Sequence, residues 1–492
     1  MSLEFSKAKN QSLTCSYNDI YLHSSYNPEQ ESSRIASSVT FDFIPENIFI
    51  LEGALGYIIK PLKEKYPSTK IYAIRYTSEI KSIYEYEKEF IYNSNEQLKN
   101  ELYNYFGEEK LLNSYFFSWP PSSKVFSEKD SSMWNLIKEL LTECQMVLTT
   151  REYFSTRWLK NSINFFSNIK NFRILKKIES PILICASGPS LKNQIDYIKK
   201  YQDKFFIIAC SSSIKFLIKN NINIDLCITT DGGYYAKKHL QCLLDSKKIY
   251  NIALTSESNV PNKIFDKHNI IPLAYLDNLD NYIMEKLKIK YNIAKRNGTI
   301  TGTALELALS LTNNDILLCG CDLENNKTFP HTQPNELEEN NCIFDNKIAT
   351  KEKRIFIQNQ SSIQLQVYKN YFINKSYSVK NVYRISNNYN YKNSLGQIPD
   401  INWTEYLKNK NFLTIDKSEF FTDIASIKTK KHELYKIFTL LITNEEFIKI
   451  YFPAFFVSKN RKSTTIEYNE KLNNKITSIK NYIEKLNQKV FK

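Results

Sequence analysis

The stretch that decides the fold is Pro181-Ile-Leu-Ile-Cys-Ala-Ser-Gly-Pro-Ser-Leu191. An apolar run, Ile182 to Ala186, leads directly into the turn Ser187-Gly-Pro-Ser190, and a helical pattern follows at once. A strand, a tight glycine turn and a helix in this order aim backbone N–H groups at a phosphate. The stretch therefore predicts an α/β domain with an anion-binding turn. No Lys-Ser or Lys-Thr pair closes the turn, which argues against an ATP-hydrolysing phosphate loop.

Glycine is scarce in this chain and is clustered around that turn. Only 10 of the 492 residues are glycine, and six of them fall between residues 188 and 320. Where glycine is rare, clustering indicates backbone positions that other residues cannot occupy. The six are Gly188, Gly232, Gly233, Gly298, Gly302 and Gly320. Their clustering supports the hypothesis of a nucleotide-sugar site built around the turn.

Short apolar runs alternate with helical stretches from Pro181 onward. The predicted strands are 181–186, 205–210, 225–230, 249–255, 270–275 and 315–320. Helical stretches lie between several of them, including 215–221 and 303–311. This alternation predicts a mostly parallel sheet covered on both faces. In such sheets ligands bind beyond the carboxyl ends of the strands, so the residues that follow each strand are candidates. They are Ser187-Gly188, Ser211 to Ser213, Asp231-Gly-Gly233, Ser256-Glu257 and Asp322.

Two candidates follow from that rule or lie at a helix start. Asp231, in Asp-Gly-Gly, follows a predicted strand, where its carboxylate could accept a hydrogen bond from a ribose or an acceptor hydroxyl. A helix cap is the equally favoured alternative for this residue. The stretch Asn297-Gly-Thr-Ile-Thr-Gly-Thr303 places hydroxyls and small residues at a helix start, which suits base and phosphate contacts. Close packing of helix and sheet is the alternative for its glycines.

A further constellation joins Asp322, which follows the last of these strands, to His331 nine residues on. Near neutral pH a histidine can take a proton from an attacking hydroxyl. The alternative for His331 is an ordinary histidine in a surface loop. The sequence contains no HExxH motif, paired-carboxylate glycosidase signature or GxSxG elbow. No metal site is predicted.

The segments on either side carry weaker patterns. Residues 1–45 show no strong period and predict an irregular lead-in, whereas 47–75 predict a βαβ opening. Arg75 stands where a dinucleotide site would want an acidic residue, which favours structural packing there. Residues 80–175 look largely helical, and an aromatic stripe at helical spacing predicts a connecting helix over 153–166.

The end of the chain is mostly helical in pattern. A helix within 355–372 and a strand at 381–386 are expected to return to the same sheet. After about residue 415 the pattern is helical and basic. The last stretch, 464–490, has Ile and Leu at roughly heptad spacing, and packing on the body is favoured over packing on a partner helix.

Composition narrows the class of protein. The net charge is +14, and residues 401–492, with 17 Lys and Arg against 10 Asp and Glu, carry half of it. Such a tail could attract nucleic acid, an anionic membrane or an acidic protein, but a solvated helical surface is favoured and no nucleic-acid motif accompanies it. No uncharged apolar run approaches the roughly 20 residues of a membrane span. Nine cysteines without a CxxC pair predict reduced thiols. We expect a cytoplasmic protein.

In this order, these motifs resemble the motility-associated factor (Maf) family of flagellin glycosyltransferases. The turn at 187–191 matches the family's SGPSL-type turn, and 298–311 resemble its glycine-hydroxyl stretch and following helix. Gly320-Cys-Asp-Leu323 matches its glycine-x-aspartate-leucine step, and Pro330-His331 resembles the loop after it. Ala54-Leu-Gly-Tyr57 and the basic tail fit the family's three-part build. The central part is also similar to bacterial sialyltransferases.

The resemblance implies an activity. A nonulosonic acid, of the pseudaminic or legionaminic type, would move from a CMP-activated donor to serine or threonine of flagellin, without a metal or further cofactor. It implies a donor site made of Ser187, Gly188, Pro189, Ser190, Ser212, Gly298, Thr299, Thr301 and Asp322. Asp231 and His331 would be catalytic, with His331 as the candidate base. The sugar, the acceptor and the oligomeric state are not predicted by the sequence.

The expected fold class is α/β. A central Rossmann-like, mostly parallel sheet domain is preceded by a smaller Rossmann-like α/β domain and followed by a helical C-terminal domain. The expected boundaries are 1–150 for the first domain with its lead-in, 151–180 for a helical connector, 181–410 for the sialyltransferase-like catalytic domain and 411–492 for the basic helical domain. Two other functions stay open: a pterin pyrophosphokinase, which would need ATP and Mg²⁺, and a non-catalytic flagellin-binding or assembly protein.

Overall fold

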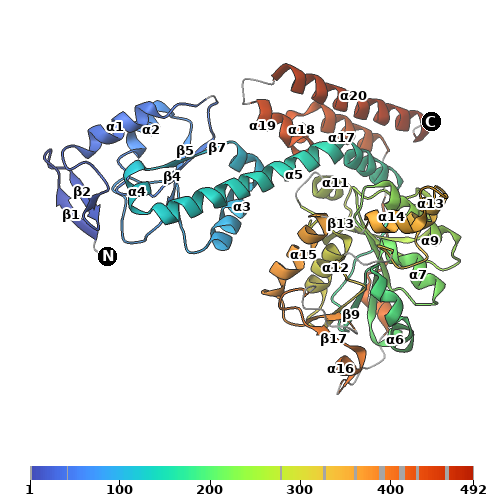
Figure 1. Cartoon of the computed structure of the whole chain (residues 1–492). Helices are drawn as coiled ribbons and strands as arrows, with labels where there is room; N and C mark the ends of the chain where they lie inside the picture. The colour runs from blue at the N-terminus through green and yellow to red at the C-terminus, as the bar shows by residue number, and fades with distance from the viewer. Residues whose placement is uncertain are drawn as a thin grey trace. The chain divides into compact units, whose positions relative to one another are not determined.

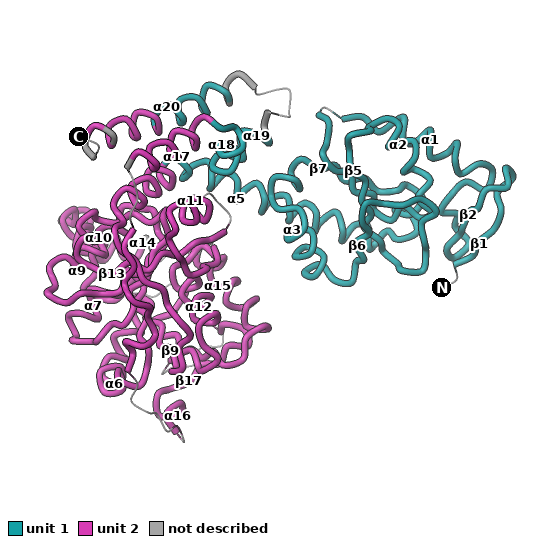
Figure 2. The backbone as a smooth tube through the Cα atoms, turned by 180° about the vertical axis from the view of Figure 1, so that it is seen from behind, with its two compact units in different colours: residues 1–156, 444–478 teal, residues 157–443, 479–492 magenta. Residues whose placement is uncertain are grey.

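The computed structural model describes residues 3–41, 43–276, 280–324, 329–358, 363–386, 394–408, 410, 416–427, 431–459 and 465–490. The chain divides into two compact units (Figure 2). Unit 1 is Met1–Thr156 with Asn444–Ser478, and unit 2 is Arg157–Thr443 with Ile479–Lys492. Two helices, α5 (Ser127–Asn168) and α20 (Thr465–Val490), have residues in both units. The finer domain boundaries expected from the sequence stay a prediction.

Unit 2 is built on one parallel sheet, which has nine strands within the described residues. They are β9 (Ile182–Cys185), β10 (Phe206–Cys210), β11 (Leu226–Thr229), β12 (Asn251–Thr255), β13 (Asn269–Ala274), β14 (Asn292–Ile293), β15 (Ile316–Cys319), β16 (Val382–Ile385) and β17 (Asp400–Ile401). The central strands β9, β10, β11 and β15 are buried along their whole length because helices cover both faces of the sheet. The predicted parallel sheet is therefore confirmed, and the predicted return of 381–386 to it is confirmed by β16.

The strand order places a switch point beside β9. The order is β14-β13-β12-β11-β10-β9-β15-β16-β17, so the chain winds outward from β9 to β14 and then returns to the other side of β9. Ile182 of β9 pairs with Phe206 on one side and with Ile316 on the other. Ligands of open α/β sheets bind at such a reversal, beyond the carboxyl ends of the strands. Here that position lies after β9 and β15.

Helices cover both faces of this sheet, with α12 and α15 on one face and α7 and α9 on the other (Figure 1; Figure 2). The helices of unit 2 are α6 (Ile195–Tyr201), α7 (Ile214–Lys219), α8 (Tyr234–His239), α9 (Gln241–Asp245), α10 (Lys263–Lys267), α11 (Asp280–Lys286), α12 (Ile300–Leu311), α13 (Glu336–Cys342), α14 (Lys351–Gln358), α15 (Ile363–Ser376), α16 (Trp403–Leu407) and α17 (Lys431–Thr443). The last residues of α5 also belong to unit 2, where β8 (Asn171–Phe172) pairs with β18 (Ala425–Ser426).

Unit 1 has a smaller parallel sheet in the order β6-β5-β4-β7. Its strands are β4 (Asn47–Leu51), β5 (Lys70–Arg75), β6 (Glu89–Ile91) and β7 (Ser114–Ser118). Its helices are α1 (Pro28–Ser38), α2 (Ile59–Lys65), α3 (Asn95–Leu112), α4 (Pro120–Val125), the first part of α5, α18 (Glu445–Tyr451), α19 (Pro453–Lys459) and part of α20. The βαβ opening predicted over 47–75 is confirmed.

One expectation about unit 1 is wrong. The lead-in is not irregular, because β1 (Leu3–Lys7), β2 (Leu13–Tyr17) and β3 (Ile20–Tyr21) form an antiparallel sheet and α1 follows it. These strands are short and largely polar, so they show no clear alternation of apolar residues. The segment 80–175 is largely helical, as predicted, because α3, α4 and α5 make up most of it. It also contains the short strands β6 and β7, which period alone does not separate from the long helices beside them.

The carboxyl edge of the small sheet is filled by side chains of unit 1 itself. Glu52 and Arg75 form a fully buried ion pair of 3.3 Å. Glu52 also accepts hydrogen bonds from the N–H groups of Tyr76 and Thr77. A Cβ added at Gly53 would collide with the Tyr86 hydroxyl. This edge supports the expectation of structural packing around Arg75.

The C-terminal helix α20 packs on the protein itself. The apolar residues Ile479 and Ile483 of α20 are buried within the chain, as the favoured hypothesis of packing on the body predicts. Among the helices of the described residues, none combines the length and the apolar character needed to cross a membrane.

Candidate functional site

The glycine turn after β9 lies at the switch point and is closed by Asp322. The Gly188 N–H donates to the Gly320 carbonyl oxygen at 2.8 Å. The Ser190 N–H donates to Asp322 Oδ2 at 2.9 Å, and the Ser190 hydroxyl donates to Oδ1. A Cβ at Gly188 would lie 2.5 Å from the Gly320 oxygen and 2.6 Å from Asp322 Oδ2, so this close approach requires glycine.

The turn runs into a 3₁₀ helix, Pro189–Gln194, before α6 begins. Pro189 occupies its first turn, where a missing N–H costs no hydrogen bond. The structure thus brings together the predicted donor residues Ser187, Gly188, Pro189, Ser190 and Asp322. Because Asp322 accepts hydrogen bonds from the turn, we assign it a positioning role.

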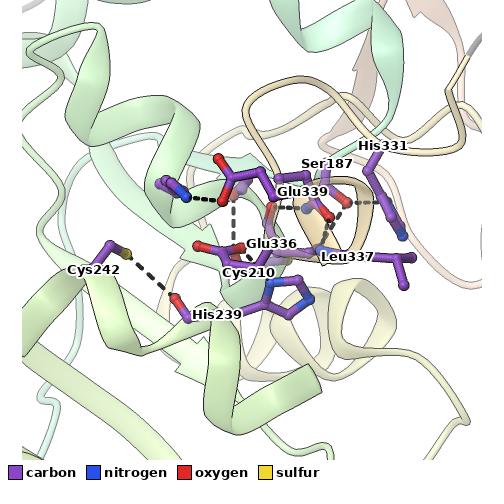
Figure 3. A network of polar contacts seen from close by, with 12 residues as sticks. Ser187, Cys210, His239, Cys242, His331, Glu336, Leu337 and Glu339 are labelled. Carbon is purple, nitrogen blue, oxygen red and sulfur yellow. Dashed lines mark hydrogen bonds and ion pairs between the residues drawn. The ribbon is translucent and has the colours of Figure 1, made fainter. Parts of the chain in front are cut away.

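A chain of three side chains joins the turn to the loop that carries His331. The Ser212 hydroxyl, which follows β10, donates to Ser187 Oγ at 2.7 Å. Ser187 Oγ lies 2.8 Å from His331 Nδ1, and Figure 3 shows the two side chains joined. The Thr332 N–H donates to the Ser187 carbonyl at 2.7 Å, and the Asn335 amide donates to the Ser212 carbonyl at 3.0 Å. The loop at 331–335 is therefore fastened to the carboxyl ends of β9 and β10.

His331 is a neutral imidazole at physiological pH. Burial lowers its pKa to about 4, and the nearby His239 adds to this effect. His239 Nδ1 in turn lies 2.7 Å from Glu336 Oε2, a contact that is also visible in Figure 3. Both the desolvation and the like charge disfavour an imidazolium at position 331.

The second predicted donor loop, 297–303, leads into α12 close to the end of β10. Thr299 is the N-cap of α12, and its hydroxyl accepts a hydrogen bond from the Gly302 N–H at 2.9 Å. Gly298 has φ +82°, a left-handed conformation that favours glycine. Thr301 Oγ1 lies 3.7 Å from Cys210 Sγ at the end of β10. Burial raises the pKa of that thiol to about 12, which makes it unreactive.

Asp231 lies exposed after β11. Its Oδ1 accepts a hydrogen bond from the Gly233 N–H at 2.7 Å. The N-cap of α8 is Gly233, so Asp231 stabilises the turn before the helix and is not its cap. Burial and the negative charge of Asp231 raise the pKa of Tyr368 on α15. A Cβ at Gly298 would lie 3.5 Å from the Tyr368 ring, which places Asp231 and the 297–303 loop on the same side of the site.

Four residues that were not assigned to the site from the sequence hold this part of the edge together. Arg296 forms a bidentate ion pair with Glu257, with nitrogen–oxygen distances of 2.9 and 3.2 Å. Its guanidinium lies over the rings of Trp158 and Tyr275, 5.2 and 4.1 Å from their centroids. The Asn161 amide donates to the carbonyls of Gly232 and Glu257 at 3.2 and 2.8 Å. We call Trp158, Asn161, Glu257 and Arg296 the edge clamp.

The edge clamp connects three parts of the predicted site. Arg296 directly precedes the 297–303 loop, Glu257 follows β12, and Asn161 fixes the glycine next to Asp231. Glu257 stood out in the sequence only as a residue after a predicted strand. Trp158 and Asn161 lie on α5, in the segment expected to be a connector, and carried no signal of this contact.

Basic side chains border the other side of the turn. Arg384 is buried and forms a bidentate pair with Asp400 at 2.6 and 2.7 Å, and its Nη1 donates to the Cys321 carbonyl at 3.5 Å. Burial and the charge of Arg384 lower the pKa of Lys369. Burial and the charge of Asp322 raise the pKa of Glu324. Positive and negative groups are therefore packed closely beside Asp322.

Glu338, Cys342 and Asp345 form a group with metal-like spacing within the described residues. Arg354 donates to both of its carboxylates at 2.6 to 3.0 Å, so these oxygens already have a cationic partner. A cluster neutralised in this way does not fit a metal ion.

The fold and the site define a class of protein: a doubly wound α/β protein with amide and hydroxyl donors at its switch point, an exposed carboxylate and a neutral histidine. Residues 156–328 match the family model of 6-hydroxymethylpterin diphosphokinase MptE-like proteins. The chain is also similar to the solved structure of the MAf glycosyltransferase from Magnetospirillum magneticum AMB-1. That similarity has a TM-score of 0.56 and 11% identity, and it covers 97% of this chain and 86% of the other. The resemblance predicted from the sequence is thus confirmed at the level of the fold.

A curated relative gives no further assignment. An uncharacterized protein of Treponema pallidum (strain Nichols) is 28% identical over 234 residues, which is 47% of this chain. The match spans 51% of the length of that relative.

Proposed function

We propose that this protein is a glycosyltransferase that moves a nonulosonic acid from a CMP-activated donor to serine or threonine of flagellin in the cytoplasm. The observation that supports it most is the closed glycine turn at the switch point, linked through Ser187 to Ser212 and His331. Backbone N–H groups and hydroxyls at this position suit the phosphate of a nucleotide sugar. The glycosyltransferase fold over nearly the whole chain agrees with this proposal.

In the proposed reaction an acceptor hydroxyl attacks the anomeric carbon, and the bond from that carbon to the CMP phosphate oxygen breaks. The proposed donor-binding residues are Ser187, Gly188, Pro189, Ser190, Ser212, Gly298, Thr299 and Thr301, all predicted from the sequence, and Asp322 positions the turn. Asp231 and His331 are the proposed catalytic residues. The developing phosphate charge is stabilised by fixed donors aimed at it, which is the largest contribution in many enzymes.

We further propose that transfer needs no metal ion. The carboxylates around the turn already bind protein donors, since Asp322 accepts from Ser190 and Glu257 is paired with Arg296. The positive charge of the neighbouring Lys369 provides a complement for the anionic donor instead. Transfer that persists in excess EDTA is expected, and transfer restored only by Mg²⁺ or Mn²⁺ would contradict this part.

Calorimetry with CMP, ADP, UDP and GDP in EDTA tests the donor assignment. CMP is expected to bind tightest, and Ser190→Ala is expected to weaken it while Ser310→Ala, on α12 away from the turn, leaves it unchanged. Tight binding of another nucleotide without CMP affinity would refute the donor. Mass spectrometry of flagellin incubated with the protein and a CMP-nonulosonate then tests transfer, and binding of flagellin without transfer would indicate a non-catalytic role.

A second candidate is a pterin pyrophosphokinase, because the matched family model describes 6-hydroxymethylpterin diphosphokinase MptE-like proteins. That reaction would transfer a diphosphate from ATP to a pterin hydroxymethyl group. Incubation with ATP, Mg²⁺ and 6-hydroxymethylpterin, followed by chromatography, distinguishes the two candidates. Formation of the pterin diphosphate would favour this candidate over sugar transfer.

A further inference from the structure

We propose that Tyr368 on α15 binds the acceptor hydroxyl together with Asp231, so that the two side chains form an acceptor subsite for serine or threonine. No role was assigned to Tyr368 from the sequence. This assignment rests on the proposed function and adds to it the groups that hold the acceptor.

The packing of α15 on α12 fixes where Tyr368 lies. Tyr371 and Lys375 follow Tyr368 at helical spacing, so the three side chains share one face of α15. The Tyr371 hydroxyl donates to Glu306 Oε1 of α12 at 2.8 Å, and Lys375 Nζ lies 2.9 Å from the same oxygen. The face that carries Tyr368 is thus anchored to α12 one turn away from it.

Tyr368 reaches the loop 297–303 at the start of α12. A Cβ at Gly298 would lie 3.5 Å from Cε1 and 3.8 Å from Cδ1 of the Tyr368 ring. Cε1 adjoins the ring carbon that carries the hydroxyl, so the hydroxyl end of the side chain lies at this loop. Thr301 of the same loop lies 3.7 Å from Cys210 at the end of β10. The Tyr368 hydroxyl therefore lies at the carboxyl edge of the sheet.

The charge of Asp231 acts on this hydroxyl. Burial and that charge both raise the pKa of the phenol, so Tyr368 keeps its proton and can donate at physiological pH. Tyr368 is half-buried, and no described residue makes a hydrogen bond with its hydroxyl. Asp231 is exposed, and within the described residues only its Oδ1 accepts a hydrogen bond, from Gly233. One O–H donor and one carboxylate oxygen are therefore available to a ligand.

A hydroxyl group fits this pair of side chains. A serine or threonine hydroxyl has one hydrogen to donate and lone pairs that accept. It can donate to Asp231 Oδ2 and accept from Tyr368 at the same time. A protonated amine has no lone pair and cannot accept from Tyr368, so the pair favours a hydroxyl acceptor.

The spacing of the strands leaves room for the transferred sugar. The glycine turn follows β9 and Asp231 follows β11, with β10 between these strands. Neighbouring strands are about 4.8 Å apart, so the two positions are separated by about 10 Å across the sheet. A donor phosphate at the turn and an acceptor hydroxyl at Asp231 then leave space for one sugar between them.

Transfer kinetics with flagellin and a CMP-nonulosonate test the assignment in Tyr368→Phe, which keeps the ring and lacks only the hydroxyl. We expect kcat/KM for flagellin to fall about 3–10-fold, as for one neutral hydrogen bond, while the donor KM and the calorimetric affinity for CMP stay within about 2-fold of the wild type. Tyr377→Phe, at an exposed position just after α15, serves as the unchanged control. An unchanged kcat/KM for flagellin, or an equal loss of CMP affinity, would overturn the proposal.

Fluorine NMR tests the pair of side chains without any substrate. 3-Fluorotyrosine is introduced only at position 368 of the full chain, and its phenol is titrated with and without Asp231→Asn. We expect it to titrate above free 3-fluorotyrosine and to lose part of this shift in Asp231→Asn, but not in Asp266→Asn, which changes an exposed carboxylate. No change in Asp231→Asn would overturn the pairing whether or not the protein transfers sugar. Absence of transfer in the wild type would instead refute the proposed function, and the acceptor role with it.

Discussion

Replacing Arg296 with methionine is expected to destabilise unit 2 more than replacing its partner Glu257 with glutamine. The two side chains share the same ion pair but differ in exposure, since 30% of the Arg296 side chain and 4% of the Glu257 side chain reach solvent. Without Arg296, a buried carboxylate loses its bidentate cation. Removing one partner of a buried pair costs about 3–5 kcal/mol.

The substitution Glu257→Gln instead removes the carboxylate and keeps Arg296. In Glu257→Gln the amide oxygen still accepts from the guanidinium, and the partly exposed arginine can regain water. We expect a loss of about 1–2 kcal/mol, the scale of one weakened hydrogen bond to a charged group. Arg296→Met also loses the contacts with Trp158 and Tyr275, worth about 0.5–1 kcal/mol each at partly exposed sites.

Urea unfolding of the full chain, followed by circular dichroism and tryptophan fluorescence, measures both variants. Lys170→Met is the control, because its pair with Asp266 is exposed on both sides and is expected to leave the midpoint unchanged. A larger loss in Glu257→Gln than in Arg296→Met would refute the reasoning from exposure. Equal losses with an altered m-value would show that the variants change the unfolding mechanism, which refutes it as well.

Three further outcomes are expected. Asp322→Ala removes the acceptor for two donors of Ser190, so calorimetry should show CMP binding about 10–100-fold weaker, and unchanged affinity would contradict the closed turn. Gly320→Ala and Gly107→Ala both strain a positive φ, but only at Gly320 does the added Cβ meet a backbone oxygen, at 2.6 Å. The Gly320 variant should therefore unfold with about 1–3 kcal/mol more destabilisation, and equal losses would exclude the clash. Finally, His331 binds fewer protons than the unfolded chain between pH 6.5 and about 4, so stability falls as pH drops through that window. In urea unfolding, the free energy of unfolding of His331→Gln should decrease by about 1–3 kcal/mol less than that of the wild type between pH 6.5 and 4. An identical decrease in the two proteins would show that His331 titrates normally.

The sheet of unit 2 could be predicted because its strands are short apolar runs that end in turn residues. Each strand predicted from Pro181 onward lies within a residue or two of an observed one, such as 205–210 beside β10 (Phe206–Cys210). The edge strands β14 and β17 were missed, since two residues each carry no period. A strand that is buried on both faces has a nearly continuous apolar run, which can be recognised in the sequence. A short strand at the edge of the sheet does not need such a run.

The edge clamp could not be predicted because its members meet only in the folded chain. Asn161 and Gly232 are 71 residues apart, and their contact depends on the last turns of α5 lying across the carboxyl ends of β11 and β12. An aromatic stripe such as that around Trp158 predicts packing, but it does not say against what. The sequence therefore indicated the helix and not its contribution to the site.

The closed turn shows where sequence reasoning could have gone one step further. Gly188 and Gly320 are 132 residues apart in the sequence. In the structure, a Cβ at Gly188 would meet the carbonyl oxygen of Gly320, and a Cβ at Gly320 would meet that of Ala186, just after β9. The Gly188 N–H binds the Gly320 oxygen, and the positive φ of Gly320 places that oxygen and Asp322 against the turn. Two glycines that stand within three residues of the end of an apolar strand in a glycine-poor chain are best explained by neighbouring strand ends that approach too closely for a Cβ. That argument predicts the β9–β15 adjacency, and with it the switch point, from spacing alone.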